Sequence, residues 1–372
     1  FMRSLGLGDG GRVLVVVAGG RVWTSVGISK RSRFTGDDAF VERARYRVCE
    51  ACKSPQITNI GVDPAPDCQQ CGTSFAEHAG TRNFIRPNGF LTSITDSDGR
   101  DPGASRIRPV VSDEALLLTE APRAAYAATD IPGLLTFHAP GSNRPEHELG
   151  RIITVNRGRH KGGFAWCGSC EHAVPVRGGG PPDRMWQTVQ KLGEHTNPRT
   201  GQVCRADPDA NIYPVDLAHI FETDVRALMF DSTPRSPQGL DLSSHRSLGR
   251  TLQEALRLGA ADLLETDPRD IKALIQRLDG RLVIVLYDAV SGGAGYATRL
   301  TREDGFMVQD LLFAARKILD CANPDCRTSC TRCLNDYSNQ AYWLDFERHP
   351  ALAWIETILI DAGLKITPAS ML

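Results

Sequence analysis

The sequence lacks any long apolar segment. None of its runs approaches the about 20 consecutive apolar residues that a membrane-spanning helix needs. Residues 13–18 form an apolar run of strand length, and the Gly-rich residues before them do not resemble a signal peptide. We therefore expect no membrane partner and a location in the cytoplasm. The first residue is Phe1 rather than Met, which suggests a fragment or a truncated reading of a longer gene.

The sequence also lacks the motifs of ATP-driven and hydrolytic enzymes. It contains no GxxxxGK[ST] phosphate-binding loop, no HExxH and no GxSxG. Residues 113–116 read DEAL, but no apolar strand precedes them and no phosphate-binding loop accompanies them. We interpret their likeness to an ATPase motif as coincidence. We expect no catalytic residues and no enzymatic activity in this chain.

Net charge is almost absent, with 43 Lys and Arg against 44 Asp and Glu. This balance argues against a chain that binds DNA by charge alone, because such binding depends on neutralising many phosphates. Basic residues are nevertheless concentrated in residues 30–47 and 151–161. Each stretch is either a solvated surface or a patch that faces phosphates.

No cysteine is left without a place in a metal-site pattern. Eight of the 11 cysteines form four CxxC units, which in a reducing compartment indicate metal ligands rather than disulfides. Two of these units are separated by 15 residues, and two CxxC turns together supply a tetrahedral set of thiolates. A pair of redox dithiols is the alternative. The expected ligands of this first zinc site are Cys49, Cys52, Cys68 and Cys71.

A second site begins with another CxxC unit. It needs ligands from farther along the chain, and the turn-rich residues 195–204 begin with a histidine and end with a cysteine. Three thiolates and one imidazole are an ordinary structural zinc set. His172 and His219 compete for the imidazole position. The expected ligands are Cys167, Cys170, His195 and Cys204.

A third site is formed by four cysteines within 13 residues. Zinc is the expected metal, and an iron–sulfur cluster is the alternative because thiolates also hold such clusters. The three sites together predict three Zn²⁺ ions and folding that depends on metal. The expected ligands of the third site are Cys321, Cys326, Cys330 and Cys333.

The hydrophobic pattern predicts several elements. Residues 12–17 and 21–28 flank a glycine pair and predict a hairpin. Residues 244–264 have the spacing of an amphipathic helix, and a second helix is expected from Asp267. Residues 281–287 predict a buried strand.

A glycine-rich loop follows this strand and precedes a helix expected to end near Asp320. Its main-chain NH groups either cradle a phosphate or only allow a sharp turn that Asp288 holds in place. We favour the structural role. The residues of this structural loop are Asp288, Gly292, Gly293 and Gly295.

These elements predict an α+β protein, with small zinc-ribbon-like β modules followed by an α/β zinc-binding domain that contains the four-cysteine cluster. Turn-rich residues suggest the boundaries. The expected segments are a β-rich region with the first cysteine pairs (1–94), a linker and connecting segment (95–148), a second zinc module (149–213), the α/β zinc-binding domain (214–345) and a C-terminal helix (346–372).

Two sequence stretches together resemble the MrfA-type zinc-binding (MZB) domain. They are residues 286–296 (LYDAVSGGAGY) and residues 333–340 (CLNDYSNQ), which flank and close the four-cysteine cluster. Residues 219–225 (HIFETDV) fit the opening of that domain, and Asp345 and Arg348 follow its closing motif. The domain is found in the C-terminal region of superfamily 2 DEAD/DEAH-box DNA helicases and in DrmB-like proteins of the DISARM phage-defence system.

The N-terminal half is similar to the region between motor and zinc domain in such helicases, at residues 17–28, 46–49 and 86–90. The resemblance implies a zinc-binding accessory module that supports DNA binding and strand separation in DNA repair or phage defence. The motor, which this chain lacks, would lie upstream or on a partner. The alternative is a DrmB-like scaffold that docks a separate helicase.

The expected partners are therefore DNA and a helicase motor. Tyr46 and Trp166 are candidates for stacking on bases, because aromatic rings stack on bases of any sequence. The candidate DNA-binding residues are Arg31, Arg33, Arg45, Arg47, Arg157, Arg159 and Lys161.

Overall fold

The computed structural model describes residues 15–18, 21–28, 42–49, 55–68, 72–75, 80–86, 90–92, 113–117, 126–137, 149–157, 162–176, 194–197, 201–205, 211–230, 246–278, 281–300 and 305–366. These residues combine a large sheet with several helices, which confirms the expected α+β class. Among them, no helix combines the length and the apolar composition that a membrane crossing requires.

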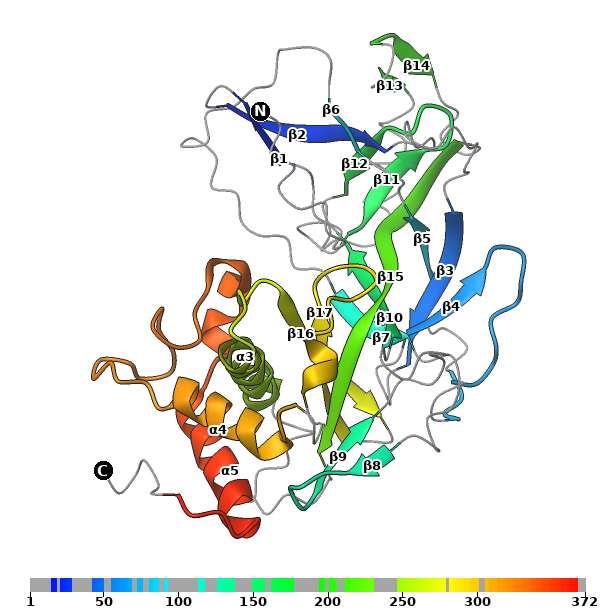
Figure 1. Cartoon of the computed structure of the whole chain (residues 1–372). Coiled ribbons are helices and arrows are strands. Elements are labelled where there is room, and N and C mark those ends of the chain that lie inside the picture. Colours follow the sequence, from blue (N-terminus) through cyan, green and yellow to red (C-terminus); the bar gives the residue numbers. More distant parts are fainter. Residues whose placement is uncertain are drawn as a thin grey trace.

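The longest strand, β15 (Ile212–Phe230), runs through the sheet from one end of the molecule to the other (Figure 1). Its residues are nearly all buried because other chain segments cover both faces along most of its length. Four strands pair with it antiparallel and one parallel. They are β9 (Leu134–Phe137), β10 (Leu149–Asn156), β11 (Phe164–Cys167) and β17 (Arg281–Asp288), and the parallel β5 (Arg82–Arg86).

Further strands extend this sheet on either side of β15. β3 (Glu42–Val48) lies between β5 and β4 (Pro55–Asn59), and β12 (Ala173–Pro175) pairs with β11. Two short strands, β7 (Asp113–Leu117) and β8 (Tyr126–Ala128), pair with β10 and β9. The sheet has 12 strands among the described residues. It draws strands from each of the first four predicted segments, including the expected linker.

Two hairpins stand outside this sheet. β1 (Val15–Ala18) and β2 (Arg21–Ile28) pair antiparallel across two intervening residues, which confirms the predicted hairpin, and β6 (Phe90–Thr92) adds a third strand. β13 (Glu194–Thr196) and β14 (Val203–Arg205) form a separate two-stranded sheet at one end of the molecule (Figure 1).

The prediction of a helix that begins at Asp267 is wrong. Residues 271–278 form a strand, β16 (Ile271–Leu278), that pairs antiparallel with β17 along its whole length. Two residues of the sequence, Asp279 and Gly280, lie between the end of β16 and the start of β17. An Asp-Gly pair between apolar runs is a strong hairpin signal, and here pairing with a buried strand overrides a pattern that also fits a helix.

Helices cover one face of the sheet at the β16–β17 end (Figure 1). The predicted helix over 244–264 is confirmed as α3 (Arg246–Leu263), and the next predicted helix as α4 (Val308–Leu319), with Asp320 as its C-cap. Short 3₁₀ helices η2 (Ala297–Arg299) and η3 (Tyr337–Asp345) precede and follow α4, and α5 (Arg348–Asp361) is the last described helix. Their apolar side chains pack with those of β9, β15, β16 and β17 in the largest core cluster.

Candidate metal centres

The four cysteines of the third site converge in the irregular chain between α4 and η3. The Sγ atoms of Cys321 and Cys330 are 3.7 Å apart, as are those of Cys326 and Cys333. All four sulfur atoms lie within 4.8 Å of one another. Zinc bound tetrahedrally at about 2.3 Å from each sulfur would separate the sulfurs by about 3.8 Å. The four side chains therefore match the dimensions of a structural zinc site.

Main-chain and side-chain donors point at one of these thiols. The Arg332 NH lies 3.4 Å and the Asn323 amide 3.6 Å from Cys330 Sγ. Burial raises the pKa of Cys330, but these donors outweigh it and lower the pKa to about 6. Burial raises the pKa of Cys326 and Cys333 above the ordinary thiol value. Metal binding at this site therefore has to displace protons.

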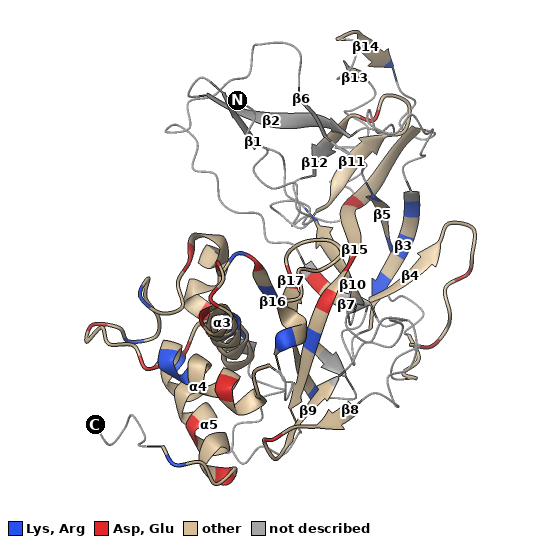
Figure 2. Cartoon of the chain, viewed as in Figure 1, with Lys and Arg blue, Asp and Glu red and all other residues tan. Residues whose placement is uncertain are grey.

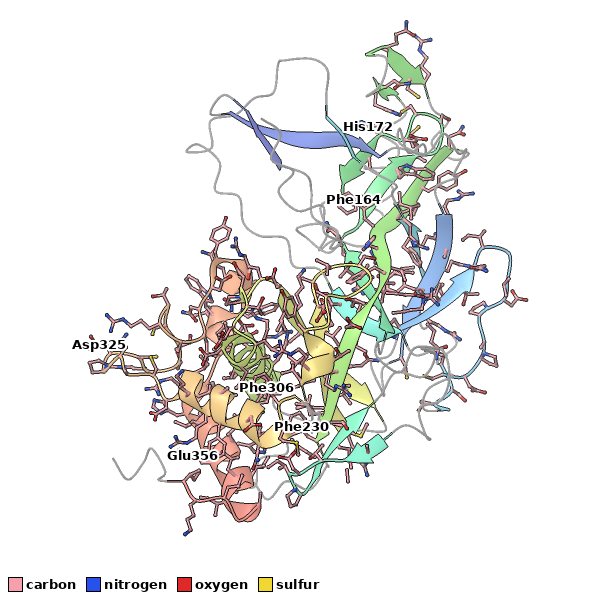
Figure 3. The ribbon with its side chains drawn as sticks, viewed as in Figure 1. Phe164, His172, Phe230, Phe306, Asp325 and Glu356 are labelled. Carbon is pink, nitrogen blue, oxygen red and sulfur yellow. The ribbon has the colours of Figure 1, made fainter. Side chains whose placement is uncertain are left out.

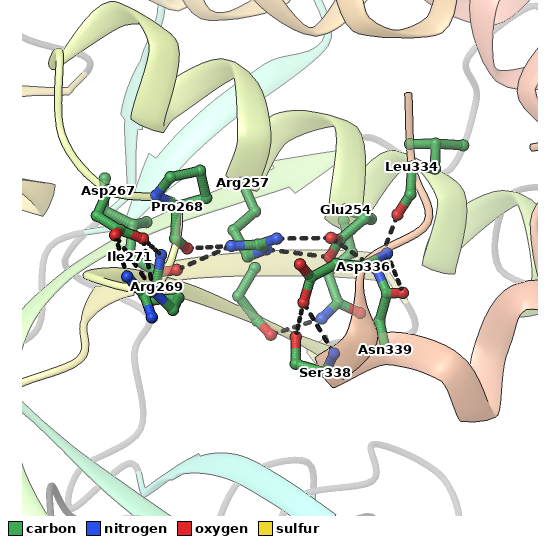
Figure 4. Close-up of polar contacts among 12 residues, drawn as sticks. Glu254, Arg257, Asp267, Pro268, Arg269, Ile271, Leu334, Asp336, Ser338 and Asn339 are labelled. Atoms are coloured by element: carbon green, nitrogen blue, oxygen red, sulfur yellow. Dashed lines mark hydrogen bonds and ion pairs between the residues drawn. The ribbon is translucent and has the colours of Figure 1, made fainter. Parts of the chain in front are cut away.

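A buried amide anchors the chain that follows the third site (Figure 4). Asn339 Nδ2 donates to Glu254 Oε1 at 2.9 Å and to the Leu334 carbonyl at 2.8 Å. Asn339 Oδ1 accepts from Trp343 Nε1 and from the Asp336 NH, each at 2.8 Å. All four hydrogen-bonding positions of the amide are used. The residues after Cys333 are thereby fixed to α3, which carries Glu254.

The second site is assembled from a turn and a hairpin. Cys167 and Cys170 lie on the turn that ends β11, and His195 and Cys204 face each other across β13 and β14. The four ligand atoms lie within 4.8 Å of one another. Cys170 Sγ and His195 Nε2 are 2.9 Å apart, and a tetrahedral zinc would widen this contact to about 3.5 Å. Burial raises the pKa of Cys170 to about 12.

The structure separates the three histidines considered for this site. His195 is in the ligand group, whereas His172 stacks on its ring with centroids 5.0 Å apart. His219 lies within β15 and stacks on Phe221. Figure 3 shows His172 at the β11–β12 end of the molecule, far from Phe230 at the opposite end of β15. Sequence spacing alone left these alternatives open.

The structure describes two of the four expected ligands of the first site. Cys49 and Cys68 are each 2 % exposed and pack with Phe75, whereas Cys52 and Cys71 lie outside the described residues. Gln56 Nε2 lies 3.1 Å from Cys68 Sγ. The Gly72 NH donates to the Cys68 carbonyl, and Gly72 has a φ of 69°. Zinc is therefore supported at two four-ligand groups, and a third ion stays a prediction.

The glycine-rich loop is held by a buried carboxylate. Asp288 Oδ2 accepts from the NH groups of Ala294 and Tyr296 at 2.6 and 3.0 Å, and Oδ1 accepts from that of Ala297 at 2.8 Å. Asp224 accepts from the Gly295 NH at 2.9 Å. Burial raises the pKa of Asp288, and the neighbouring Asp224 adds to this effect.

The remaining loop donors also have partners. The Gly292 NH donates to the Glu222 carbonyl and the Gly293 NH to that of Val290. Six consecutive NH groups, 292 to 297, are thus directed at the protein's own oxygens. A side chain at Gly293 would overlap the Asp224 carboxylate, which explains the glycine there. This arrangement favours the structural role of the loop over phosphate binding.

Three candidate DNA-binding residues are described, and each contacts its own fold. Arg45 donates to the Val62 carbonyl, the Arg47 guanidinium lies 3.5 Å from the Phe75 ring centroid, and Arg157 donates to the Tyr46 hydroxyl. The other candidates, Arg31, Arg33, Arg159 and Lys161, lie outside the described residues.

The expectation of base stacking by Tyr46 and Trp166 is wrong, because both rings are buried in the sheet, at 2 % and 3 % exposure. Figure 2 shows Lys and Arg interspersed with Asp and Glu along the described part of the chain.

A buried ionic group was missed in the sequence. Asp216 of β15 is fully buried and accepts from Arg82 at 2.6 and 2.7 Å and from the Tyr46 hydroxyl at 2.8 Å. Burial raises the pKa of Tyr46, and the Asp216 charge adds to this effect. The group joins β3, β5 and β15. The only signal in the sequence was an acid among the apolar residues of this strand, which requires a partner when buried.

Comparison with known proteins supports the zinc domain. Residues 252–334 match the family model described as MrfA Zn-binding domain, and this range includes all four cysteines of the third site. The chain is 31% identical over 207 residues to Druantia protein DruE of Escherichia coli (strain UMEA 4076-1). That alignment covers 51% of this chain and 10% of the relative, so the chain spans about a tenth of the length of that protein.

Among solved structures, the chain matches one described as the crystal structure of DUF1998 helicase MrfA bound to DNA. The match has 13% sequence identity and a TM-score of 0.35, and it covers 67% of this chain and 25% of that chain.

Proposed function

We propose, from the premise that residues 252–334 match the MrfA Zn-binding domain, that this chain is the zinc-binding accessory part of a DNA helicase. It supports DNA binding and strand separation for a motor that lies upstream or on a partner, and it has no enzymatic activity of its own. The observation that carries the proposal is the set of four sulfur atoms within 4.8 Å of one another inside the matched residues.

The zinc has a structural role in this proposal. Cys321, Cys326, Cys330 and Cys333 would hold one ion, and the second four-ligand group would hold another. Four protein ligands complete a tetrahedral shell and leave no position open for water or substrate. Bound zinc supplies folding free energy to chain segments that contain little regular structure.

DNA contact is assigned to the four remaining candidate basic residues, which lie outside the described part of the chain. Because the described arginines Arg45, Arg47 and Arg157 contact their own fold, the proposal rests on Arg31, Arg33, Arg159 and Lys161. Lys and Arg there would neutralise phosphates, so binding should weaken as salt rises. The biological setting would be DNA repair or phage defence in the cytoplasm.

A scaffold that docks a separate helicase is the second candidate. It is favoured by the use of the three described arginines within the fold and by a net charge of −1. In this case, the chain would contact DNA little and would resemble DrmB-like proteins.

The two candidates are separated by DNA binding of the purified chain. Fluorescence anisotropy with single-stranded and duplex DNA at several salt concentrations is expected to show salt-dependent binding that the Arg159→Ala, Lys161→Ala double variant weakens. The matched control is Lys317→Ala on α4, whose exposed side chain pairs with Asp262. No binding, together with stable co-purification with a helicase, would favour the scaffold. Metal-dependent cleavage of DNA would contradict both.

A further inference from the structure

Arg348 is a buried arginine at the start of α5. The residue is 8 % exposed, and its guanidinium donates to two main-chain carbonyls. Nε and Nη2 lie 3.1 and 2.8 Å from the carbonyl oxygen of Cys326, and Nη1 lies 3.1 Å from that of Leu319. The Arg348 NH also donates to the Thr328 carbonyl at 3.0 Å. This one residue therefore joins α5 to the end of α4 and to the cysteine loop, residues 321–333.

The guanidinium has no carboxylate partner in the part of the chain that the structure describes. Its hydrogen bonds there end on neutral carbonyl oxygens. A buried cation is strongly disfavoured unless an opposite charge lies close by. A neighbouring anionic group would therefore stabilise this arginine.

The metal centre supplies such a group. Four thiolates around one Zn²⁺ carry a net charge of about −2, and that charge is the largest in the neighbourhood when the site is filled. Cys326 contributes a sulfur to this centre and its carbonyl to the arginine. The cation and the centre are thus in contact through one residue.

We propose that Arg348 is the counter-charge of the four-cysteine zinc centre and that, through it, metal occupancy and the docking of α5 are coupled. The inference rests on zinc binding at Cys321, Cys326, Cys330 and Cys333. When zinc leaves, the buried guanidinium loses its opposite charge. The contact between α5 and the cysteine loop is then weakened, although α5 keeps its apolar packing through residues such as Trp354.

A matched control lies one helix away. Arg316 of α4 pairs with Glu356 of α5 at 2.8 Å, so it also joins these two helices through a partly buried guanidinium. Its partner is a carboxylate of the protein and not the metal centre. Arg316→Met should lower stability without changing zinc affinity.

The test measures zinc release from the full chain to a chromogenic chelator. The release step that is missing in Cys330→Ser identifies the third site. Arg348→Met is expected to weaken zinc at this site about 10-fold to 100-fold, as is usual when groups around the ligands are removed. Arg316→Met should leave the zinc affinity of the third site unchanged. Arg348→Lys keeps the positive charge but loses the planar guanidinium that donates to both carbonyls. Its zinc affinity should lie between those of the wild type and Arg348→Met.

Hydrogen exchange of α5 gives a second readout. In the wild type, chelation should increase exchange in Arg348–Asp361, and in Arg348→Met the exchange should depend less on zinc. Equal zinc affinity of Arg348→Met and wild type would overturn the inference. An equal loss of stability in Arg348→Met with and without zinc would also overturn the inference, because that result is expected if the arginine has only a structural role. If Arg348→Met does not fold, wild-type affinity in Arg348→Gln would overturn it as well.

The failure of this inference is distinct from failure of the proposed function. A wild-type chain without zinc at the third site contradicts the proposed function itself. Zinc that is bound normally in all Arg348 variants contradicts only the role of the arginine.

Discussion

Single buried carboxylates organise two separate regions of this fold. Asp288 accepts three main-chain NH groups from the glycine-rich loop, and Asp216 accepts Arg82 and Tyr46 from neighbouring strands. Each is fully buried. A buried carboxylate is tolerated only where donors surround it, so each acid fixes the geometry of the groups that donate to it.

Asp288→Asn should destabilise the protein by about 1–3 kcal/mol, because an amide places NH groups against main-chain donors. The folded-state pKa of Asp288 is raised, so the folded state binds this proton more tightly than the unfolded chain. The contribution of Asp288 is therefore greatest at low pH and is lost as the pH rises through the raised pKa. Urea unfolding at several pH values should show a larger difference from wild type near about pH 4 than near about pH 7.

Asp267→Asn is the control for this measurement. Hydrogen bonds from Arg269 lower the pKa of the exposed Asp267 to about 2, so its small contribution is present above the ordinary carboxyl pKa and is lost as the pH falls. Its pH dependence has the opposite sign to that of Asp288. A pH-independent effect of Asp288→Asn would contradict the assignment of a raised pKa.

Removal of one thiol should remove one metal ion. Cys330→Ser is expected to lower the zinc content by one ion per chain, and Cys167→Ser should do the same at the second site, because each group has four ligands and no spare one within the described residues. Elemental analysis of the purified chain measures this. Ser329→Ala, beside the third site, should keep the wild-type content. A full zinc content in Cys330→Ser would show that the third site does not hold the ion.

At the scale of elements, the second metal site joins a small hairpin to the large sheet. β13 and β14 pair only with each other in the part of the chain that the structure describes, and they carry His195 and Cys204 to the two thiols at the end of β11. The position of the hairpin should therefore depend on the metal.

Chelation is expected to increase hydrogen exchange in β13 and β14 before exchange increases in the buried strand β15. The reason is that the metal would supply the main attachment of the hairpin. Hydrogen exchange measured by mass spectrometry tests this. In Cys330→Ser, which affects the other site, the hairpin should stay protected. Unchanged exchange after complete removal of zinc would show that other contacts hold it.

The elements and ligand groups were predictable to the extent that their signals are local. CxxC spacing brings two thiols to one turn wherever it occurs, so the cysteine groups were visible in the sequence. The choice of His195 over His172 and His219 depended on the pairing of β13 with β14, which spacing does not give. β16 was mistaken for a helix because its apolar positions fit both periods, and its pairing with β17 decides the outcome.

At the scale of the whole molecule, β15 is shared by strands from most of the chain. Asp216 lies near one end of it and Phe230 at the other, where Phe230 contacts Trp354 of α5. The Asp216 partners could not be predicted because Arg82 and Tyr46 are 134 and 170 residues away in sequence. Only the pairing of the strands brings them together.

Asp216→Ala should lower the free energy of unfolding by about 2–3 kcal/mol, less than for a fully buried pair because Arg82 is 35% exposed and can be hydrated. If the sheet unfolds as one unit, hydrogen exchange should increase at both ends of β15. Asp262→Ala, which removes an exposed pair with Lys317, should change stability by less than about 1 kcal/mol. Destabilisation confined to β3 and β5 would show that the two ends unfold separately.

The length of the continuous strand Ile212–Phe230 also limits which insertions and deletions this protein can accept during evolution. Alternate side chains of a strand point to opposite faces, so the gain or loss of one residue would exchange the two faces for the rest of the strand. Asp216 would turn away from Arg82, or the apolar residues that face the helices would turn toward the opposite face. We therefore expect natural length variation to accumulate in the connections before and after this strand, and its 19 residues to keep their number.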